Sequence, residues 1–131
     1  MIVVTLWGCS QSQQTPENLS IQIDALLEKD LYVEALAVLD GIEASEETTS
    51  LKEKVHLNYG LFLEYRDSNT TNMRDKMNGA LAQYIEVLKI NENNEKAISE
   101  IEQILGIYAT FPDRSPDPQI VEELQKLGFE V

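Results

Sequence analysis

The stretch ALAQYIEVLKINENN, from Ala80 to Asn94, decides how this chain folds. Apolar side chains recur along it with helical spacing, which places Ala80, Tyr84, Val87 and Leu88 on one stripe. Its Asn-rich end predicts a turn. A second helix is then predicted from Glu95, with an inner face made of Ala97, Ile98, Ile101, Leu105 and Tyr108. The sequence therefore predicts two helices that are joined by a short turn.

The rest of the chain repeats this alternation of apolar stripes and polar turns. Helices are predicted from Pro16 to Glu28 and from Tyr32 to Ile42, and a capping box of Ser50 and Glu53 is predicted to start the next one after a polar link. The turn DSNTTN, residues 67–72, precedes a helix that includes Met73 and Met77, and Pro118 starts a last helix that Gly128 stops. No run of alternating β-branched and aromatic residues predicts a strand, so the fold class is all-α.

Two motifs resemble the tetratricopeptide (TPR) repeat. DLYVEAL, residues 30–36, is similar to the start of the second helix of that repeat, and Tyr59-Gly60 with Leu63 is similar to its first helix. The resemblance implies a right-handed α-α superhelix of about two and a half helical hairpins plus a C-terminal capping helix. It also implies that the repeats pack through Ala35, Gly60, Ala80 and Tyr84. From Ile23 to Ala35 is 12 residues and from Gly60 to Ala80 is 20, so the second repeat carries an eight-residue insertion.

Residues 1–15, MIVVTLWGCSQSQQT, carry no charged side chain and differ from the rest. The apolar run Ile2–Trp7 is too short to cross a bilayer and is similar to the end of a secretory signal peptide. Leu6-Trp7-Gly8-Cys9 resembles a bacterial lipobox, which implies lipidation of Cys9 and a flexible tether before a helical domain of residues 16–131. The alternative is an incidental Cys9 in a cytoplasmic protein with no lipid anchor.

The charge of the chain limits its partners. With 23 acidic and 10 basic residues, the net charge is −13, which repels nucleic acid and anionic membrane surfaces. An acidic surplus mostly serves solubility, and it also attracts a basic partner. The expected contact with a membrane is therefore through the lipid anchor only, and the residues specify no oligomeric state.

Residue patterns for catalysis are missing. His56 is the only histidine and Cys9 the only cysteine, so the sequence offers no tetrahedral metal site, and we interpret His56 as a packed or surface residue. No Gly-rich phosphate loop and no nucleophile with an evident base occur. The chain is predicted not to be an enzyme and to need no cofactor or metal.

The expected function is binding or assembly with a protein or peptide partner, in the bacterial cell envelope or, alternatively, as a soluble cytoplasmic adaptor. The TPR family binds segments on a groove formed chiefly by the first helix of each pair. Leu57, Leu61 and Tyr65 recur every four residues and could form an apolar strip on that wall or belong to the core. The predicted protein-binding groove comprises Leu27, Leu57, Leu61, Glu64, Tyr65, Gln103 and Ile107.

Overall fold

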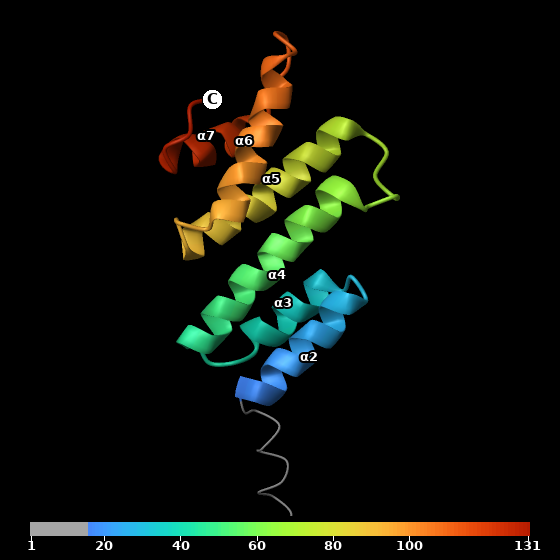
Figure 1. Cartoon of the computed structure of the whole chain (residues 1–131), viewed down its shortest axis with the longest axis vertical. Helices are drawn as coiled ribbons and strands as arrows, with labels where there is room; N and C mark the ends of the chain where they lie inside the picture. The colour runs from blue at the N-terminus through green and yellow to red at the C-terminus, as the bar shows by residue number, and fades with distance from the viewer. Residues whose placement is uncertain (1–15) are drawn as a thin grey trace, which may run out of the picture. The chain divides into compact units, whose positions relative to one another are not determined.

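The computed structural model describes residues 16–131, and this part of the chain consists of six α-helices with no strand (Figure 1). The prediction of an all-α fold is confirmed. The contacts divide the chain into two compact units, with the boundary between Leu51 and Lys52. The helices are α2 (Pro16–Glu28), α3 (Tyr32–Asp40), α4 (Glu46–Tyr65), α5 (Met73–Ile90), α6 (Glu95–Ala109) and α7 (Pro118–Lys126).

In the first unit, α2 and α3 contact each other as a helical hairpin. Ile23 and Ala35 are fully buried, as the apolar spacing of the two helices predicts. The turn between them depends on Asp30, whose φ of 59° lies in the left-handed region. The Asp30 carboxylate accepts a hydrogen bond of 2.7 Å from the Tyr32 hydroxyl. Asp is one of the few residues that tolerate this backbone conformation, and the hydrogen bond holds it in place.

The start of α4 differs from the prediction. Helix α4 begins at Glu46, so the prediction that Ser50 and Glu53 cap it is wrong. Ser45 and Thr48 exchange the capping hydrogen bonds instead: the Thr48 amide donates to Ser45 Oγ over 3.1 Å, and the Ser45 amide donates to Thr48 Oγ1 over 2.9 Å. This is the reciprocal arrangement of a capping box, with Thr in place of Glu.

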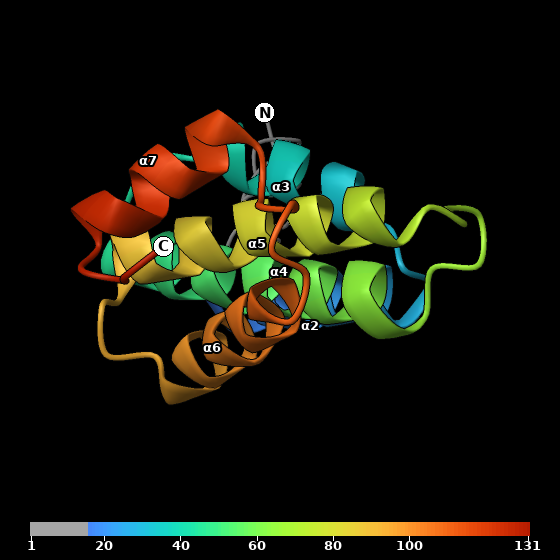
Figure 2. The same cartoon turned by 90° about the horizontal axis from the view of Figure 1, so that it is seen from above.

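The second unit contains the rest of α4 with α5, α6 and α7. Figures 1 and 2 both show α4 and α5 side by side and antiparallel, joined by the loop of residues 66–72. Asp67 holds that loop: its carboxylate accepts from the Asn69 amide and the Thr70 hydroxyl, and its carbonyl accepts from Lys76 Nζ. The central core is formed by Met77, Ala80, Leu81, Tyr84, Ile85, Val87, Leu88, Ala97, Ile101, Ile104, Tyr108 and Leu124.

The turn between α5 and α6 is the Asn-rich segment that the sequence predicts. The Asn94 side chain caps α6 by accepting from the Ala97 amide over 3.0 Å. Glu53 of α4 accepts from the side-chain amides of Asn91 and Asn94 through a single oxygen, over 2.9 and 2.8 Å. Glu53 therefore fixes this turn rather than the start of α4.

Helix α7 ends at Lys126, and Gly128, directly after the C-cap residue Leu127, stops it as predicted. Gly128 has a φ of 98°, the Phe129 amide donates to the Leu124 carbonyl, and the Gly128 amide donates to the Gln125 carbonyl. These bonds form a Schellman motif, in which Gly adopts the left-handed conformation without steric cost. Between residues 16 and 131, no helix has the length and apolar character that crossing a membrane requires.

Candidate binding site on α4 and α6

The last turn of α4 and the first half of α6 bring four polar side chains together. The Tyr65 hydroxyl donates to Glu100 Oε2 over 2.6 Å and accepts from Gln103 Nε2 over 3.0 Å. Lys96 Nζ lies 2.9 Å from Glu100 Oε1. Glu100 is only 4% exposed, whereas Tyr65 is 54% exposed. A buried carboxylate therefore holds a largely exposed aromatic ring at the surface.

Tyr84 of α5 adds a second tyrosine and a second carboxylate to this cluster. Its hydroxyl donates to Glu64 Oε1 over 2.7 Å, and its ring is fully buried. The ring fits because Gly60 faces it without a side chain: a β-carbon on Gly60 would lie 2.5 Å from Tyr84 Cε1. Gly60 thus determines where Tyr84 lies, and Tyr84 in turn holds Glu64.

Electrostatics distinguish the two carboxylates. Burial raises the pKa of Glu64 above its usual value, and repulsion from Glu100 raises it further against the hydrogen bond from Tyr84. Burial acts in the same direction on Glu100, but the hydrogen bond from Tyr65 and the ion pair with Lys96 outweigh it and lower the pKa of Glu100. Glu64 has no cationic partner among residues 16–131, so it is the carboxylate that an external cation would stabilise.

The tyrosines in this cluster are poor acids. Burial, followed by the hydrogen bond to Glu100, raises the pKa of Tyr65 to about 12. Burial and the hydrogen bond to Glu64 raise the pKa of Tyr84 as well. Both hydroxyls therefore stay protonated near neutral pH and act as hydrogen-bond donors to the carboxylates. The cluster offers a rigid aromatic surface next to negative charge.

The structure brings three of the seven predicted groove residues together, namely Glu64, Tyr65 and Gln103. Leu57 and Leu61 are partly buried and pack against the hydrophobic core of the second unit. Ile107 is 37% exposed and lines a separate cavity near the C-terminal end of α6. Leu27 belongs to the first unit and is half-buried there.

The predicted packing residues lie in two places. Ala35 is fully buried in the first unit. Gly60, Ala80 and Tyr84 are buried in the second, with Gly60 against the Tyr84 ring. Cys9, the predicted lipidation site, lies outside the described residues.

Glu100 is the functional residue that the sequence interpretation missed. It occurs three residues after Ala97 and four before Ile104, so it shares the apolar stripe of α6. An acidic residue in phase with a buried stripe needs a partner, and Lys96, one turn earlier, supplies one. The position of Glu100 on the apolar stripe, with Lys96 four residues earlier, is therefore the sequence pattern that indicates a buried ion pair.

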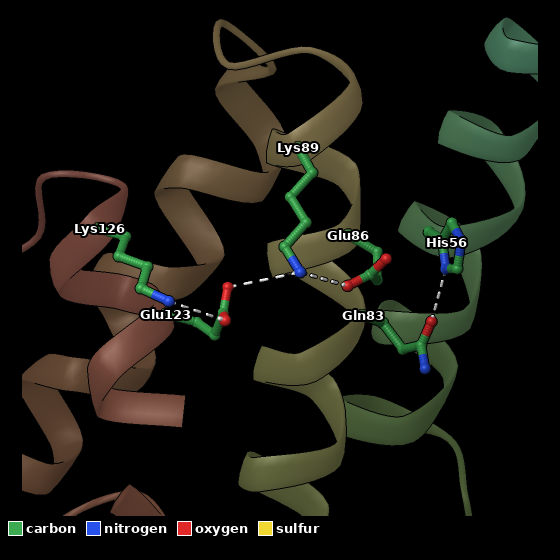
Figure 3. Close-up of polar contacts among 6 residues, drawn as sticks. All are labelled: His56, Gln83, Glu86, Lys89, Glu123 and Lys126. Carbon is green, nitrogen blue, oxygen red and sulfur yellow. Dashed lines mark hydrogen bonds and ion pairs between the residues drawn. The ribbon is translucent and has the colours of Figure 1, made fainter. Parts of the chain in front are cut away.

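Three further polar contacts lie away from this cluster (Figure 3). His56 of α4 and Gln83 of α5 are joined by a 2.8 Å hydrogen bond between Nδ1 and Oε1. Lys89 of α5 lies between Glu86, at 3.1 Å, and Glu123 of α7, at 3.4 Å. His56 thus connects α4 and α5. Within residues 16–131, no group of His, Cys, Asp and Glu side chains could hold a metal ion.

Comparison with protein-family models, with curated proteins and with solved structures gives no match for this chain. What the structure shows of residues 16–131 is an all-α fold.

Proposed function

We propose that this chain is a non-catalytic binding or assembly module, built from TPR-like helical hairpins, that holds a basic segment of a protein partner at the Glu64–Glu100 site. The observation that carries the proposal is the Tyr65 ring, which is half-exposed although both Glu100 and Gln103 hold its hydroxyl. Ordered, exposed aromatic rings are the usual anchors of protein interfaces, because they bury much area at little entropic cost.

Glu64 supplies the preference for a basic segment. Its charge is disfavoured by burial and by Glu100, and no Lys or Arg of the described chain neutralises it. A Lys or Arg of the partner would relieve this repulsion, so binding and ionisation of Glu64 favour each other. Affinity is expected to rise with pH as Glu64 ionises, and the association rate is expected to fall as salt increases.

The test uses synthetic extended peptides in which Lys alternates with apolar residues, titrated into the full chain and monitored by calorimetry. Tyr65→Ala is expected to weaken binding at least tenfold while circular dichroism shows an unchanged helix content. The matched control is Glu122→Gln, which removes one exposed carboxylate from α7. Equal binding by the wild type and Tyr65→Ala, or equal binding of a Glu-containing peptide of the same pattern, would overturn the proposal.

The TPR-like part of the proposal is supported by the close contact between Gly60 and Tyr84 and by the antiparallel pairing of neighbouring helices. The motifs around Ala35 and Gly60 support it from the sequence. An experimental structure in which successive hairpins do not stack with a constant right-handed rotation would contradict it.

We further propose that the module is tethered to the bacterial envelope by a lipid on Cys9, as the Leu6-Trp7-Gly8-Cys9 motif suggests. Cys9→Ser is then expected to move the protein from the membrane fraction to the soluble fraction of its native cell. The lipobox resemblance implies a diacylglycerol on Cys9, and two acyl chains hold a protein in a membrane far more firmly than one. The wild type should therefore resist a salt wash. An intact mass that retains Met1 and lacks lipid would favour the alternative, a soluble cytoplasmic adaptor.

A further inference from the structure

A cavity of about 600 Å³ lies between the N-terminal half of α5 and the C-terminal end of α6, away from the Glu64–Glu100 site. Cavities that bind small molecules typically measure roughly 300–1,000 Å³. Met73 and Met77 of α5 line it on one side, and Ile107 and Phe111 line it on the other. Met73 is 63% exposed and Phe111 47% exposed. A ligand in the cavity would therefore bury exposed apolar surface.

One of the residues that line the cavity carries a buried polar atom without a hydrogen-bond partner. Tyr108 is only 8% exposed, and its hydroxyl is the one buried side-chain polar atom of the described residues that forms no hydrogen bond. Leaving such a group unpaired costs roughly 1–3 kcal/mol, so an acceptor that reaches it is favoured. A ligand oxygen in the cavity would supply that acceptor.

The cavity also has an unusual charge for this chain. Two of the ten basic residues, Arg74 and Arg114, border it, although the protein carries a net charge of −13. Arg74 is held by Asp117 over 3.0 Å. The Arg114 guanidinium lies over the Phe111 ring, 5.4 Å from its centroid. Arg114 forms no ion pair with any residue from 16 to 131. Its guanidinium is therefore available to an anion.

We propose that this cavity binds a small amphipathic carboxylate, with its apolar body among Met73, Met77 and Phe111 and its carboxylate held by Arg114 and the Tyr108 hydroxyl. Methionine side chains adapt their shape, so the site suits a flexible aliphatic chain better than one rigid ring system. The guanidinium is positively charged and offers donors only, which selects an anion over an alcohol or an amine, and the hydroxyl can donate to the same anion. This binding is separate from the proposed capture of a basic segment.

The test compares three probes of equal chain length, namely octanoate, octanol and octylammonium, each titrated into the full chain. Calorimetry is expected to show octanoate binding about tenfold or more tightly than octanol and no saturable binding of octylammonium. The methyl NMR signals of Met73 and Met77 are expected to shift along the same titration. Octanol binding as tightly as octanoate, or octanoate binding that leaves both methyl signals unmoved, would overturn the proposal.

Matched variants assign the selectivity to the cavity. Arg114→Gln is expected to abolish the preference for octanoate, and Tyr108→Phe to weaken octanoate severalfold without unfolding. The control is Arg66→Gln, because Arg66 stacks on Phe62 at 5.1 Å in the same manner but outside the cavity. An equal loss in Arg66→Gln and Arg114→Gln would show a general effect of charge and overturn the assignment. Tyr65→Ala should leave octanoate binding unchanged.

Discussion

The Tyr84 ring occupies the space in which a side chain at Gly60 would begin. A β-carbon built on Gly60 would lie 2.5 Å from Cε1 and 2.8 Å from Cδ1 of that ring. Real β-carbons do not approach other atoms so closely, and the ring is fully buried and tied to Glu64, so it has little freedom to move. Gly60 is thus required by packing, although glycine is unfavourable inside a helix.

Gly60→Ala is therefore expected to destabilise the protein by roughly 1–3 kcal/mol, because the added methyl group overpacks the contact with Tyr84. Gly106 provides the control, since it also lies within a helix but a β-carbon there would meet nothing within 4 Å. Gly106→Ala is expected to stabilise by up to about 1 kcal/mol through helix propensity. Urea unfolding of both variants gives the comparison, and equal effects would contradict the packing argument.

Glu64→Gln is expected to raise the melting temperature at neutral pH. The pKa of Glu64 is raised by burial and by Glu100, so its stabilising contribution is present at low pH and is lost as pH rises through its folded-state pKa. Gln resembles the protonated form and can still accept from Tyr84. The gain should therefore disappear in acid, below the usual pKa of a glutamate.

Glu100 affects stability in the opposite direction. Because its pKa is lowered, its contribution to stability is present at higher pH and is lost as pH falls. Subtracting the wild-type curve from the Glu64→Gln curve gives the effect of removing the Glu64 charge together with its repulsion of Glu100. Glu122→Gln, which removes an exposed carboxylate from α7, serves as the control. A Glu64→Gln difference that is flat with pH would refute the interpretation of the coupled carboxylates.

Glu53→Ala is expected to cost about 1–2 kcal/mol, because the side chains of Asn91 and Asn94 lose their shared acceptor. Glu92→Ala, in the same turn but on an exposed residue, should be nearly neutral. Thermal unfolding followed by circular dichroism measures both. If the two variants have the same melting temperature, the hydrogen bonds from this turn to Glu53 contribute nothing to stability.

Helix α7 should depend on its apolar contact far more than on its ion pairs. Leu124→Ala is expected to cost roughly 2–5 kcal/mol, because Leu124 is fully buried in the core of the second unit. Lys89→Gln, which breaks the contact with Glu123 between half-exposed groups, should cost less than about 1 kcal/mol. Only the second effect should vanish in high salt, and denaturant titrations at two salt concentrations check this.

The sequence predicted the helices well because their apolar stripes are local signals, as in α5 and α6. It failed at the start of α4, where the Ser50–Glu53 spacing predicts a capping box but Ser45 and Thr48 form the cap. Glu53 instead accepts from Asn91 and Asn94, 38 and 41 positions further along the chain. No local pattern contains that contact.

The candidate site was predictable in part for a related reason. Helical spacing placed Leu57, Leu61 and Tyr65 on one edge, and the structure shows two of them packed on the core and the third exposed. Gln103 and Ile107 are one turn apart on α6, yet the first contacts Tyr65 and the second lines the cavity. Periodicity identifies a face of a helix, but the neighbouring helices decide how far along that face the core extends.

The hydrogen bonds of Asp67 bear on the loop of residues 66–72, which joins α4 to α5. Its carboxylate holds Asn69 and Thr70, and its carbonyl holds Lys76 one turn into α5. This loop is consequently an ordered connection between α4 and α5, and it ends in the Asn72 cap of α5. Shortening it would remove the cap of α5 at Asn72 together with the loop, and a tag or protease site placed there would disturb folding.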